Sequence, residues 1–287
     1  MWNQIAAHIS QATGTPFQGS DRRSVGGGCI NQGYRLADDN IAYFVKLNQA
    51  SELGMFEAEA VGLQQMQQTG TIRVPTPICY GAEGGSAYIV LEWLTLGRGN
   101  ERSWQLMGQK LAALHQANVA DKFGWERNNT IGSTTQINTW TADWITFWVE
   151  HRLSYQLKLA ERRGGHFPLQ NQLLEAVPHL LVGHTPQPSL VHGDLWSGNA
   201  AVTEAGEPVI FDPATYVGDR EVDLAMTELF GGFPASFYQG YSQVLPIEEG
   251  YQQRKTLYNL YHILNHFNLF GGSYEAQANR MMNQLLK

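Results

Sequence analysis

The chain has 287 residues, of which 43% are hydrophobic and 16% are charged, and its formal net charge is −7 at pH 7. This composition excludes a disordered chain and supplies core for one large domain or two modest ones. No dense Lys/Arg run is present, so we expect no nucleic-acid or anionic-membrane partner and favour a small-molecule partner.

The first twenty residues lack a basic start and an apolar signal-type run, and no stretch is apolar enough to span a membrane. Only two cysteines are present, Cys29 and Cys79, which are too few for a disulfide framework. These features predict a soluble protein of a reducing compartment, the cytoplasm.

The N-terminal third alternates short strand patterns with turn signals. Trp2, Ile5, Ala6 and Ile9 recur at helical spacing and predict a short amphipathic helix at the N-terminus. Runs rich in β-branched and aromatic residues, bounded by Gly, Asp and Asn, then predict strands at 31–36, 42–47, 77–81 and 87–93. One helix, 55–69, interrupts these strands.

The rest of the chain is dominated by helical patterns. We predict helices at 103–117, with Ser103 as the N-cap, and at 170–182, 220–230, 252–269 and 274–286. A further long helix carries an aromatic stripe, which is compatible with a ligand site but more typical of core. The members of the stripe are Trp140, Trp144, Phe147, Trp148, His151 and Tyr155.

This order of elements predicts an α+β chain of two lobes, joined near residues 94–99. The first lobe, 1–94, is expected to be a small antiparallel β-sheet with one helix. The second, 95–287, is expected to be larger and mainly helical.

The stretch LVHGDLWSGN, residues 190–199, places many polar groups after a short apolar strand. Two strand patterns follow, 199–203 and 208–212, and the turn between them contains Gly206, which predicts a hairpin. The open end of such a hairpin brings Asn199 and Asp212 together. An amide oxygen and a carboxylate often hold Mg²⁺ that arrives with a nucleotide, so we predict that these two residues bind the metal.

Asp194 precedes Asn199 by five residues, which is the spacing of the protein-kinase catalytic loop H-R-D-x-x-x-x-N. We therefore predict that Asp194 accepts the proton of an attacking hydroxyl, in preference to the alternative of a simple Asp/Asn turn. For His192 we favour a structural role, in which the ring orients the loop through a hydrogen bond.

Phosphoryl transfer also needs positive charge on the phosphates. Lys46 emerges from an apolar strand, where a lysine is rare unless it is paired. On the helix 55–69, Glu59 falls within the apolar face, whereas Glu57 points nearly opposite. Because a lone carboxylate on that face is costly, we pair Glu59 with Lys46; the alternative is a solvated carboxylate at the helix edge.

Gly26, Gly27 and Gly28 lie between strand-like segments, where glycine lets the backbone approach a phosphate. A glycine-rich hairpin turn is the alternative, and the lysine downstream favours the phosphate site. Asn31 stands where the kinase G-x-G-x-x-G pattern has its third glycine, which implies a looser cover. For Cys29 we expect a small buried side chain, with an oxidisable thiol as the alternative.

With these residues in place, the sequence resembles the fructosamine kinase (ketosamine-3-kinase) family, relatives of aminoglycoside phosphotransferases within the protein-kinase-like fold. The resemblance spans nearly the whole chain and is carried by GGGCINQGY, FVK, MFEAEAVGL, VPTP, FGWERNNTIGSTTQIN, LVHGDLWSGN, IFDPATYVGDREVDLAM, ELFGGFP and LNHFNLFGG. It implies that Asp194 is the catalytic base and that Asn199 and Asp212 hold Mg²⁺. It also implies that Lys46, with Glu59, orients the phosphates of ATP.

The same resemblance implies roles for three further residues. Glu92 and Leu94 match the linker whose backbone contacts adenine in this fold. Asp223 resembles the residue that steadies the catalytic loop, although a carboxylate at a helix N-terminus also stabilises the helix dipole. Trp196, next to the predicted base, is suited either to stacking on a sugar or to anchoring the loop in the core.

Only ten residues lie between Asp212 and Asp223, too few for the segment with which protein kinases seat a polypeptide. Asp212-Pro213-Ala214 stands where those enzymes have D-F-G, which argues against a switch by Phe rotation. The family resemblance implies ATP-dependent phosphorylation of the 3-hydroxyl of a ketosamine, such as a fructosamine or ribulosamine, either free or bound to a protein. The unstable product would release the amine, which is deglycation.

Three alternatives stay open at this point. In the first, the acceptor is another small hydroxyl compound, such as an aminoglycoside. In the second, the chain is a metal-dependent hydrolase, and in the third it is a nucleotide-binding regulator without catalysis. The hydrolase would use His192, Asp194, Asp212 and His184 as ligands, and it leaves Lys46 and the glycines unexplained.

Overall fold

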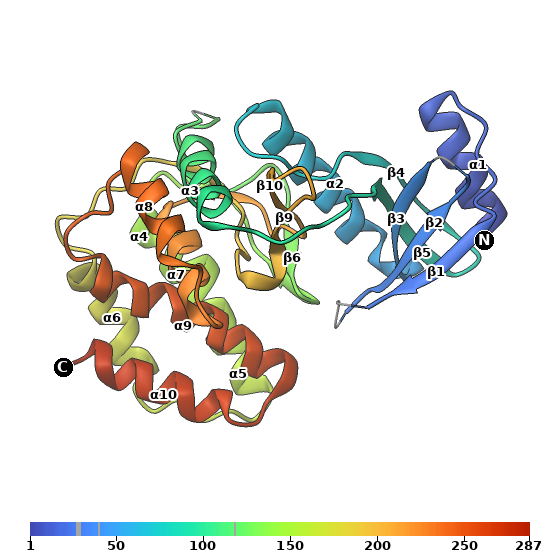
Figure 1. Cartoon of the computed structure of the whole chain (residues 1–287). Coiled ribbons are helices and arrows are strands. Elements are labelled where there is room, and N and C mark those ends of the chain that lie inside the picture. The colour runs from blue at the N-terminus through green and yellow to red at the C-terminus, as the bar shows by residue number, and fades with distance from the viewer. Residues whose placement is uncertain (27–29, 40, 118) are drawn as a thin grey trace.

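The computed structural model describes residues 1–26, 30–39, 41–117 and 119–287, which form two lobes (Figure 1). The N-terminal lobe is built on an antiparallel sheet with the spatial order β1-β2-β3-β5-β4. Its strands are β1 (Asp21–Val25), β2 (Gln32–Ala37), β3 (Ala42–Gln49), β4 (Pro77–Glu83) and β5 (Ser86–Glu92). The last four confirm predicted strands, whereas β1 was missed because its DRRSV sequence is mostly exposed and lacks an apolar pattern.

Each face of this sheet is covered by a helix. α1 (Trp2–Thr13) buries Ile5 and Ile9 against one face. α2 (Leu53–Gln68), entered through the 3₁₀ turn η1 (Ala50–Glu52), covers the other face and lies between the sheet and the C-terminal lobe (Figure 1). The N-terminal lobe therefore contains α1 as well as α2, the helix expected between its strands.

Alternation along β3 places Lys46 on the face covered by α2. Val45 and Leu47 are buried in the cluster that contains α1. Lys46, between them, consequently points to the opposite face. It pairs in register with Ile89, which is buried in the cluster that contains α2.

A linker of residues 93–100 connects the sheet to the C-terminal lobe. Leu96 forms an antiparallel bridge with Thr203. The amide of Gly97 donates to the carbonyl of Val202 at 2.7 Å, and the amide of Glu204 donates to the carbonyl of Thr95 at 3.1 Å. The linker is thereby tied to the C-terminal lobe.

Helices dominate the C-terminal lobe. They are α3 (Glu101–His115), α4 (Trp144–Phe147), α5 (Ser154–Arg162), α6 (Gln170–Leu180), α7 (Glu221–Leu229), α8 (Ala235–Val244), α9 (Tyr251–Phe270) and α10 (Tyr274–Leu285). The prediction of Ser103 as N-cap of α3 is wrong. Asn100 is the cap: its Oδ1 accepts from the amide of Ser103 at 3.0 Å, and Ser103 Oγ accepts from the amide of Asn100 at 2.8 Å, which is a capping box.

Half of the aromatic stripe belongs to the core, and its helix is shorter and less regular than predicted. Trp144, Phe147 and Trp148 are buried. Between α4 and α5 the chain forms a π-helix, η2 (Trp148–Leu153). Asp143 caps α4 by accepting from the amide of Thr146 at 2.7 Å, so Trp140 lies before the helix. Trp140 is 43% exposed.

Short antiparallel ladders carry the loops of the C-terminal lobe. β8 (Ser189–Val191) pairs with β11 (Tyr216–Gly218), and β6 (Asn129–Ile131) pairs with β7 (Thr134–Gln136). β9 (Ala200–Val202) pairs with β10 (Pro208–Ile210), which confirms the predicted hairpin. These ladders fix both ends of the stretch that contains the predicted catalytic residues.

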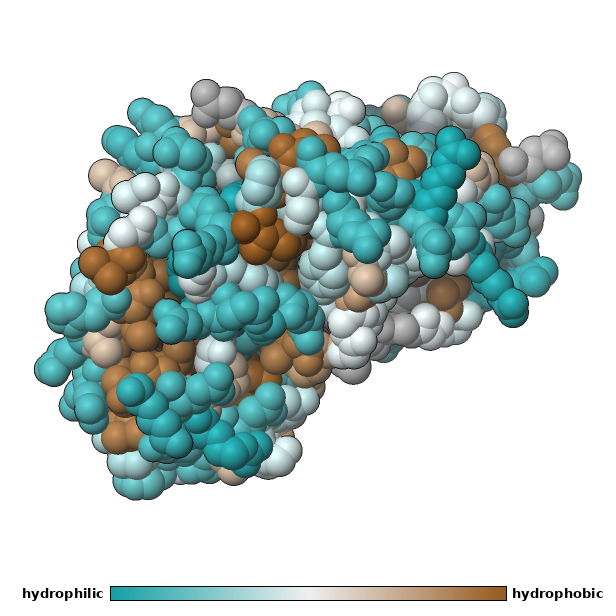
Figure 2. All heavy atoms as spheres, turned by 60° about the vertical axis from the view of Figure 1, so that its left-hand side comes forward, coloured by the Kyte–Doolittle hydropathy of each residue, from teal (hydrophilic) through white to brown (hydrophobic). Residues whose placement is uncertain are grey.

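The hydrophobic core is continuous from one lobe to the other. Phe56 and Leu63 of α2 belong to the same buried cluster as Leu111 of α3 and Leu190 of β8. Polar side chains cover much of the surface in Figure 2, and apolar ones gather on the C-terminal lobe. In the described ranges, no helix has the length and apolar character needed to cross a membrane.

Candidate active site

The stretch from His192 to Asn199 forms a tight loop between β8 and β9, and its last residues form the 3₁₀ turn η3 (Ser197–Asn199). Gly193 has a φ of 81°, and a Cβ at this position would clash with the carbonyl oxygen of Ala214. Only glycine combines this left-handed conformation with so close an approach. The loop is therefore packed directly on the chain that follows Asp212.

The buried side chains of His192 and Asp223 hold this loop in place. His192 Nε2 lies 3.0 Å from the carbonyl oxygen of Phe211, and its Nδ1 accepts from the amide of Asp194 at 3.2 Å. Burial lowers the pKa of His192, so the ring is neutral and donates from Nε2. The predicted structural role of His192 is confirmed.

Asp223, in the first turn of α7, accepts from the amides of His192 at 2.7 Å and Gly193 at 2.8 Å. His115 Nε2 lies 3.0 Å from the same carboxylate. Burial favours the neutral carboxyl, but the hydrogen bonds and nearby histidines outweigh it and lower the pKa of Asp223. This geometry fits the loop-steadying role that the family resemblance implied.

Asp194 is half-buried at the centre of the loop. The amide nitrogen of Asn199 donates to the carbonyl oxygen of Asp194 at 2.8 Å and to its carboxylate at 3.2 Å. Burial and the negative charge of Asp212 raise the pKa of Asp194 to about 7, against the opposing effect of the Asn199 hydrogen bond. A carboxyl group with this pKa is matched to proton acceptance near neutral pH.

The predicted hairpin brings Asn199 and Asp212 to its open end. Ala200 pairs with Ile210, and the amide of Phe211 donates to the carbonyl of Asn199 at 3.0 Å. Asp212 has a φ of 62°, an uncommon conformation for a residue other than glycine that marks functional sites. No local residue pattern predicts this strained backbone.

The oxygen atoms at this end of the hairpin fit a divalent cation. Asn199 turns its amide nitrogen toward Asp194, so its Oδ1 points away from that residue. The side chain of Asp212 is 49% exposed, and of its two oxygens Oδ1 is the one that bonds to Lys46. A carboxylate and an amide oxygen are the hard ligands that Mg²⁺ prefers.

Lys46 is buried between two carboxylates. Its ammonium donates to Glu59 at 2.7 Å and to Asp212 at 2.5 Å. Burial opposes the charge, but the two carboxylates outweigh burial and raise the pKa of Lys46. The predicted pairing with Glu59 is therefore present, and the contact with Asp212 joins β3 and α2 to the hairpin of the C-terminal lobe.

The glycine-rich loop follows β1. Gly26 ends the described part of this segment, and a Cβ there would meet no atom of the described residues within 4 Å, so packing against them does not explain this glycine. Gly27, Gly28 and Cys29 lie outside the described residues. Their expected roles stay predictions.

Glu92 and Leu94 lie where β5 runs into the linker. The side chain of Glu92 bonds to Arg73 at 2.5 Å and accepts from the amide of Thr76 at 3.3 Å. Arg73 also reaches Glu207 in the C-terminal lobe at 3.0 Å. Sequence reasoning missed Arg73, because nothing in its local pattern distinguishes it from a solvated surface arginine.

Trp196 follows Asp194 by two residues and is 36% exposed. Its ring contacts Phe230 edge-on, with 6.4 Å between the ring centroids. The alternative of a buried loop anchor is therefore wrong. An exposed indole beside the carboxylate remains available for contact with an acceptor.

The metal ligands expected for a hydrolase do not come together. Both ring nitrogens of His192 are engaged with the backbone. His184 instead contacts Asp219 and Glu248, and among the described residues the group of three or more ligand-type side chains consists of His184, Asp219 and Glu221. Glu221 of this group is already ion-paired with Arg254 at 2.6 Å.

His184 leads to a prediction about stability. Burial favours the neutral ring, but the hydrogen bond and charge of Asp219 outweigh it and raise the pKa of His184 above its ordinary value of 6.5. A raised pKa contributes stability that is fully present below 6.5 and is lost as pH rises through the folded-state pKa. The melting temperature should therefore decrease with rising pH above 6.5, and less so in His184→Gln. Equal pH dependence in both proteins would contradict this assignment.

Comparison with known proteins adds the family. The sequence model of the fructosamine kinase family matches residues 1–287. A probable ketoamine kinase of Synechocystis sp. is 63% identical over 286 residues, covering 100% of this chain and 97% of that protein. The chloroplastic protein-ribulosamine 3-kinase of Arabidopsis thaliana is 45% identical over 271 residues, covering 92% of this chain and 82% of that protein.

Solved structures agree with the sequence relatives. A crystal structure from Haemophilus somnus, described as a fructosamine-3-kinase, has a TM-score of 0.94 and 32% identity and covers 100% of this chain and 98% of that one. An aminoglycoside phosphotransferase in ternary complex with AMP-PNP and hygromycin B has a TM-score of 0.63 at 14% identity, over 99% of this chain and 97% of that one. The latter shows the fold alone, and it confirms the predicted two-lobed, protein-kinase-like architecture. The chain therefore belongs to the fructosamine kinase family.

Proposed function

We propose that the chain is an ATP- and Mg²⁺-dependent kinase that phosphorylates the 3-hydroxyl of a ketosamine. One observation carries the proposal, namely the convergence of Lys46, Asp212, Asn199 and Asp194. Together they supply a cation for phosphates, oxygen donors for a metal ion and a carboxylate beside them, which are the parts that phosphoryl transfer needs. The family match and the name of the ribulosamine 3-kinase relative support the acceptor class.

In this proposal the nucleotide binds between the lobes. The backbone of Glu92 and Leu94, at the end of the N-terminal lobe (1–94), contacts the adenine. Gly26, Gly27 and Gly28 cover the phosphates, and Lys46, held by Glu59 at 2.7 Å, contacts them directly. The lobe that follows, 95–287, provides the metal ligands and the acceptor site.

Asn199 and Asp212 are the residues that hold Mg²⁺ in this proposal. When bound, the ion neutralises charge on the phosphate oxygens. Asp194 accepts the proton of the acceptor hydroxyl. At the same time the hydroxyl oxygen bonds to the γ-phosphorus, and the bond from that phosphorus to ADP breaks. Asn199 also donates to the Asp194 carboxylate at 3.2 Å, which orients it toward the acceptor.

The structure between Asp212 and Asp223 favours a small or locally presented acceptor. That segment consists of β11 and the start of α7, with β11 paired to β8. A ketosamine, free or on a protein, offers its 3-hydroxyl next to a ketone, so a phosphate placed there is a good leaving group. Breakdown of the product then frees the amine. We place this deglycation in the reducing cytoplasm, in line with a chain that has two cysteines.

The proposal is tested by ADP formation with a panel of ribulosamine, erythrulosamine, fructosamine and aminoglycoside acceptors. We expect ADP formation that depends on a ketosamine and is absent with the aminoglycoside. Activity with the aminoglycoside and with no ketosamine would show that the proposed acceptor class is wrong. Absence of acceptor-dependent ADP formation across the panel would reject the kinase assignment.

The metal site gives a separate prediction. Chelation of divalent metal should reduce activity to background, and added Mg²⁺ should restore it. Asn199→Ala should raise the Mg²⁺ concentration for half-maximal activity by at least about tenfold, a loss typical even of residues that only support a metal ligand. Asn199→Asp keeps an oxygen ligand but loses the amide group that donates to Asp194, so it should keep more of the Mg²⁺ affinity than Asn199→Ala while its kcat falls. An unchanged Mg²⁺ requirement in Asn199→Ala would remove this residue from the metal site.

A further inference from the structure

Helix α2, which carries Glu59, is buried on two sides. Its bulky side packs on the sheet through Phe56, Leu63 and Met66. Its second side faces the C-terminal lobe and consists of residues at helical spacing, Ala58, Val61, Gly62 and Gln65. Sequence reasoning recognised only the bulky side.

Gly62 lies against Thr215, the third residue after Asp212. A Cβ at Gly62 would lie 2.6 Å from Thr215 Oγ1 and 3.0 Å from Thr215 Cβ. Thr215 is buried, and its carbonyl accepts from Asn129 at 2.8 Å, so it is fixed within the C-terminal lobe. Since glycine is unfavourable inside a helix, this close approach is the physical reason for glycine here.

One turn further along α2, Gln65 bonds to the C-terminal lobe. Its Oε1 accepts from Trp125 Nε1 at 2.7 Å, and Trp125 is 3% exposed within the core of that lobe. Near the start of the helix, Glu57 pairs with Arg127 at 2.9 Å, but both side chains are partly exposed and such pairs contribute little. The FGWER stretch at 123–127, which the catalytic site does not use, thus contacts α2.

We propose that α2 is permanently docked on the C-terminal lobe and that Gly62, Gln65 and Trp125 are positioning residues that keep Glu59 on Lys46. In protein kinases the placement of the corresponding helix is a point of control. Here, docking fixes that placement before the nucleotide binds. The inference rests on the proposed contact of Lys46 with the ATP phosphates.

The geometry behind this proposal is a closed ring of contacts. Glu59 bonds to Lys46, and Lys46 bonds to Asp212. Three residues later, Thr215 contacts Gly62, which is one helical turn from Glu59. A movement of α2 away from the C-terminal lobe therefore opens this contact and shifts the carboxylate that holds the lysine.

Gly62→Ala tests the ring most strongly, because the added methyl group pushes α2 away from Thr215. We expect kcat/KM for ATP and the affinity for a non-hydrolysable ATP analogue to fall by up to about 10²-fold, the cost of a misplacement of about 1 Å. Gln65→Ala should lose roughly three- to tenfold, the worth of one hydrogen bond. Thr215→Ala, combined with Gly62→Ala, should restore part of the loss because it removes the atom in closest contact.

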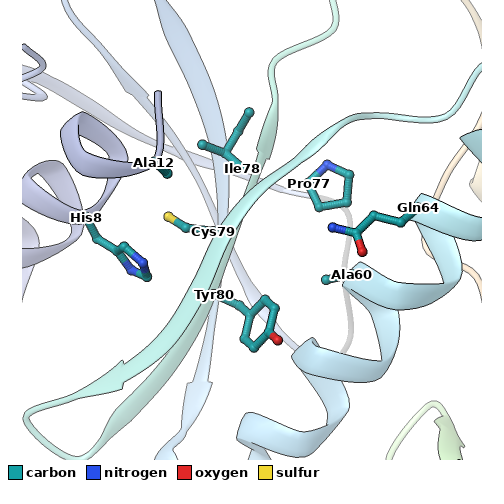
Figure 3. A pocket seen from close by; sticks show the side chains of 8 residues that line it. All are labelled: His8, Ala12, Ala60, Gln64, Pro77, Ile78, Cys79 and Tyr80. Carbon is teal, nitrogen blue, oxygen red and sulfur yellow. The ribbon is translucent and has the colours of Figure 1, made fainter. Parts of the chain in front are cut away.

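Gln64→Ala is the matched control. Gln64 is adjacent to Gln65 on the same helix, but it is exposed and points into a shallow cavity of about 360 Å³ beside β4 (Figure 3). It should change kcat/KM for ATP by less than about twofold. A loss in Gln64→Ala equal to that in Gln65→Ala would overturn the assignment of the second side as the docking surface.

A double-mutant cycle separates positioning from stability. In a Glu59→Gln background, Gly62→Ala should bring little further loss in kcat/KM for ATP, whereas its effect on melting temperature should persist. The proposal would be overturned if the fold-losses in kcat/KM for ATP of the two single variants multiplied in the double variant. It would also be overturned if Gly62→Ala lowered the melting temperature and left kcat/KM for ATP and analogue affinity unchanged. Because analogue binding needs no ketosamine, these results remain decisive even if the proposed acceptor is wrong.

Discussion

Asp194→Asn should lower kcat by about 10²- to 10⁴-fold, the range expected for loss of a positioned general base. The affinity for an ATP analogue should stay within a few-fold, because the carboxylate faces the acceptor hydroxyl in the proposed reaction. Asparagine keeps the size of the side chain and an oxygen that accepts from Asn199, which donates to Asp194 at 3.2 Å. Steady-state kinetics and equilibrium binding of the analogue measure the two effects separately.

Asp223→Asn is the contrast for this experiment. The Asp223 carboxylate holds the amides of His192 and Gly193 rather than a substrate. Its loss should therefore lower kcat and melting temperature together, whereas Asp194→Asn should lower kcat alone. A kcat within about tenfold of wild type in Asp194→Asn would withdraw the base assignment.

Lys46→Met should lower kcat/KM for ATP by about 10²- to 10³-fold, comparable to removal of one preorganised donor to transition-state charge. The ammonium bridges Glu59 and Asp212 at 2.7 and 2.5 Å, so its loss removes the link between α2 and the metal-binding end of the hairpin. Kinetics at varied ATP concentration provide the measurement. A wild-type kcat/KM for ATP would exclude Lys46 from the site.

Stability complicates the lysine variant, and a second variant resolves the complication. Lys46→Met leaves Glu59 buried without its partner, and breaking such a pair costs about 3–5 kcal/mol. Lys46→Met/Glu59→Met removes both charges, so it should regain melting temperature without regaining activity. Recovery of activity together with stability would show that the pair serves folding rather than phosphate binding.

The chemistry of the site was predictable where it depends on local spacing. The five-residue interval from Asp194 to Asn199 lies within one loop, and the hairpin that aligns Asn199 with Asp212 closes within a few residues. The Lys46 and Glu59 pair was predictable because each is a charged residue in an apolar pattern, which demands a partner. Such constraints act between residues that are near in sequence, so they appear as regular spacing or hydrophobic periodicity.

Contacts between segments distant in sequence could not be predicted from such patterns. The bond from Lys46 to Asp212 joins residues 166 positions apart, and no local sequence pattern predicts the left-handed backbone of Asp212. The second side of α2 was missed because Gly62 and Ala58 bury backbone rather than bulky side chains. β1 was missed because its side chains are mostly exposed.

The most direct test is to identify the phosphorylated position when the purified protein acts on a ribulosamine with ATP and Mg²⁺. Phosphorus and proton NMR should show one ADP per phosphorylated sugar, with the phosphate on O3, followed by release of inorganic phosphate and the free amine. Phosphate on another hydroxyl, or ADP and inorganic phosphate beside an unchanged ribulosamine, would contradict the proposed function.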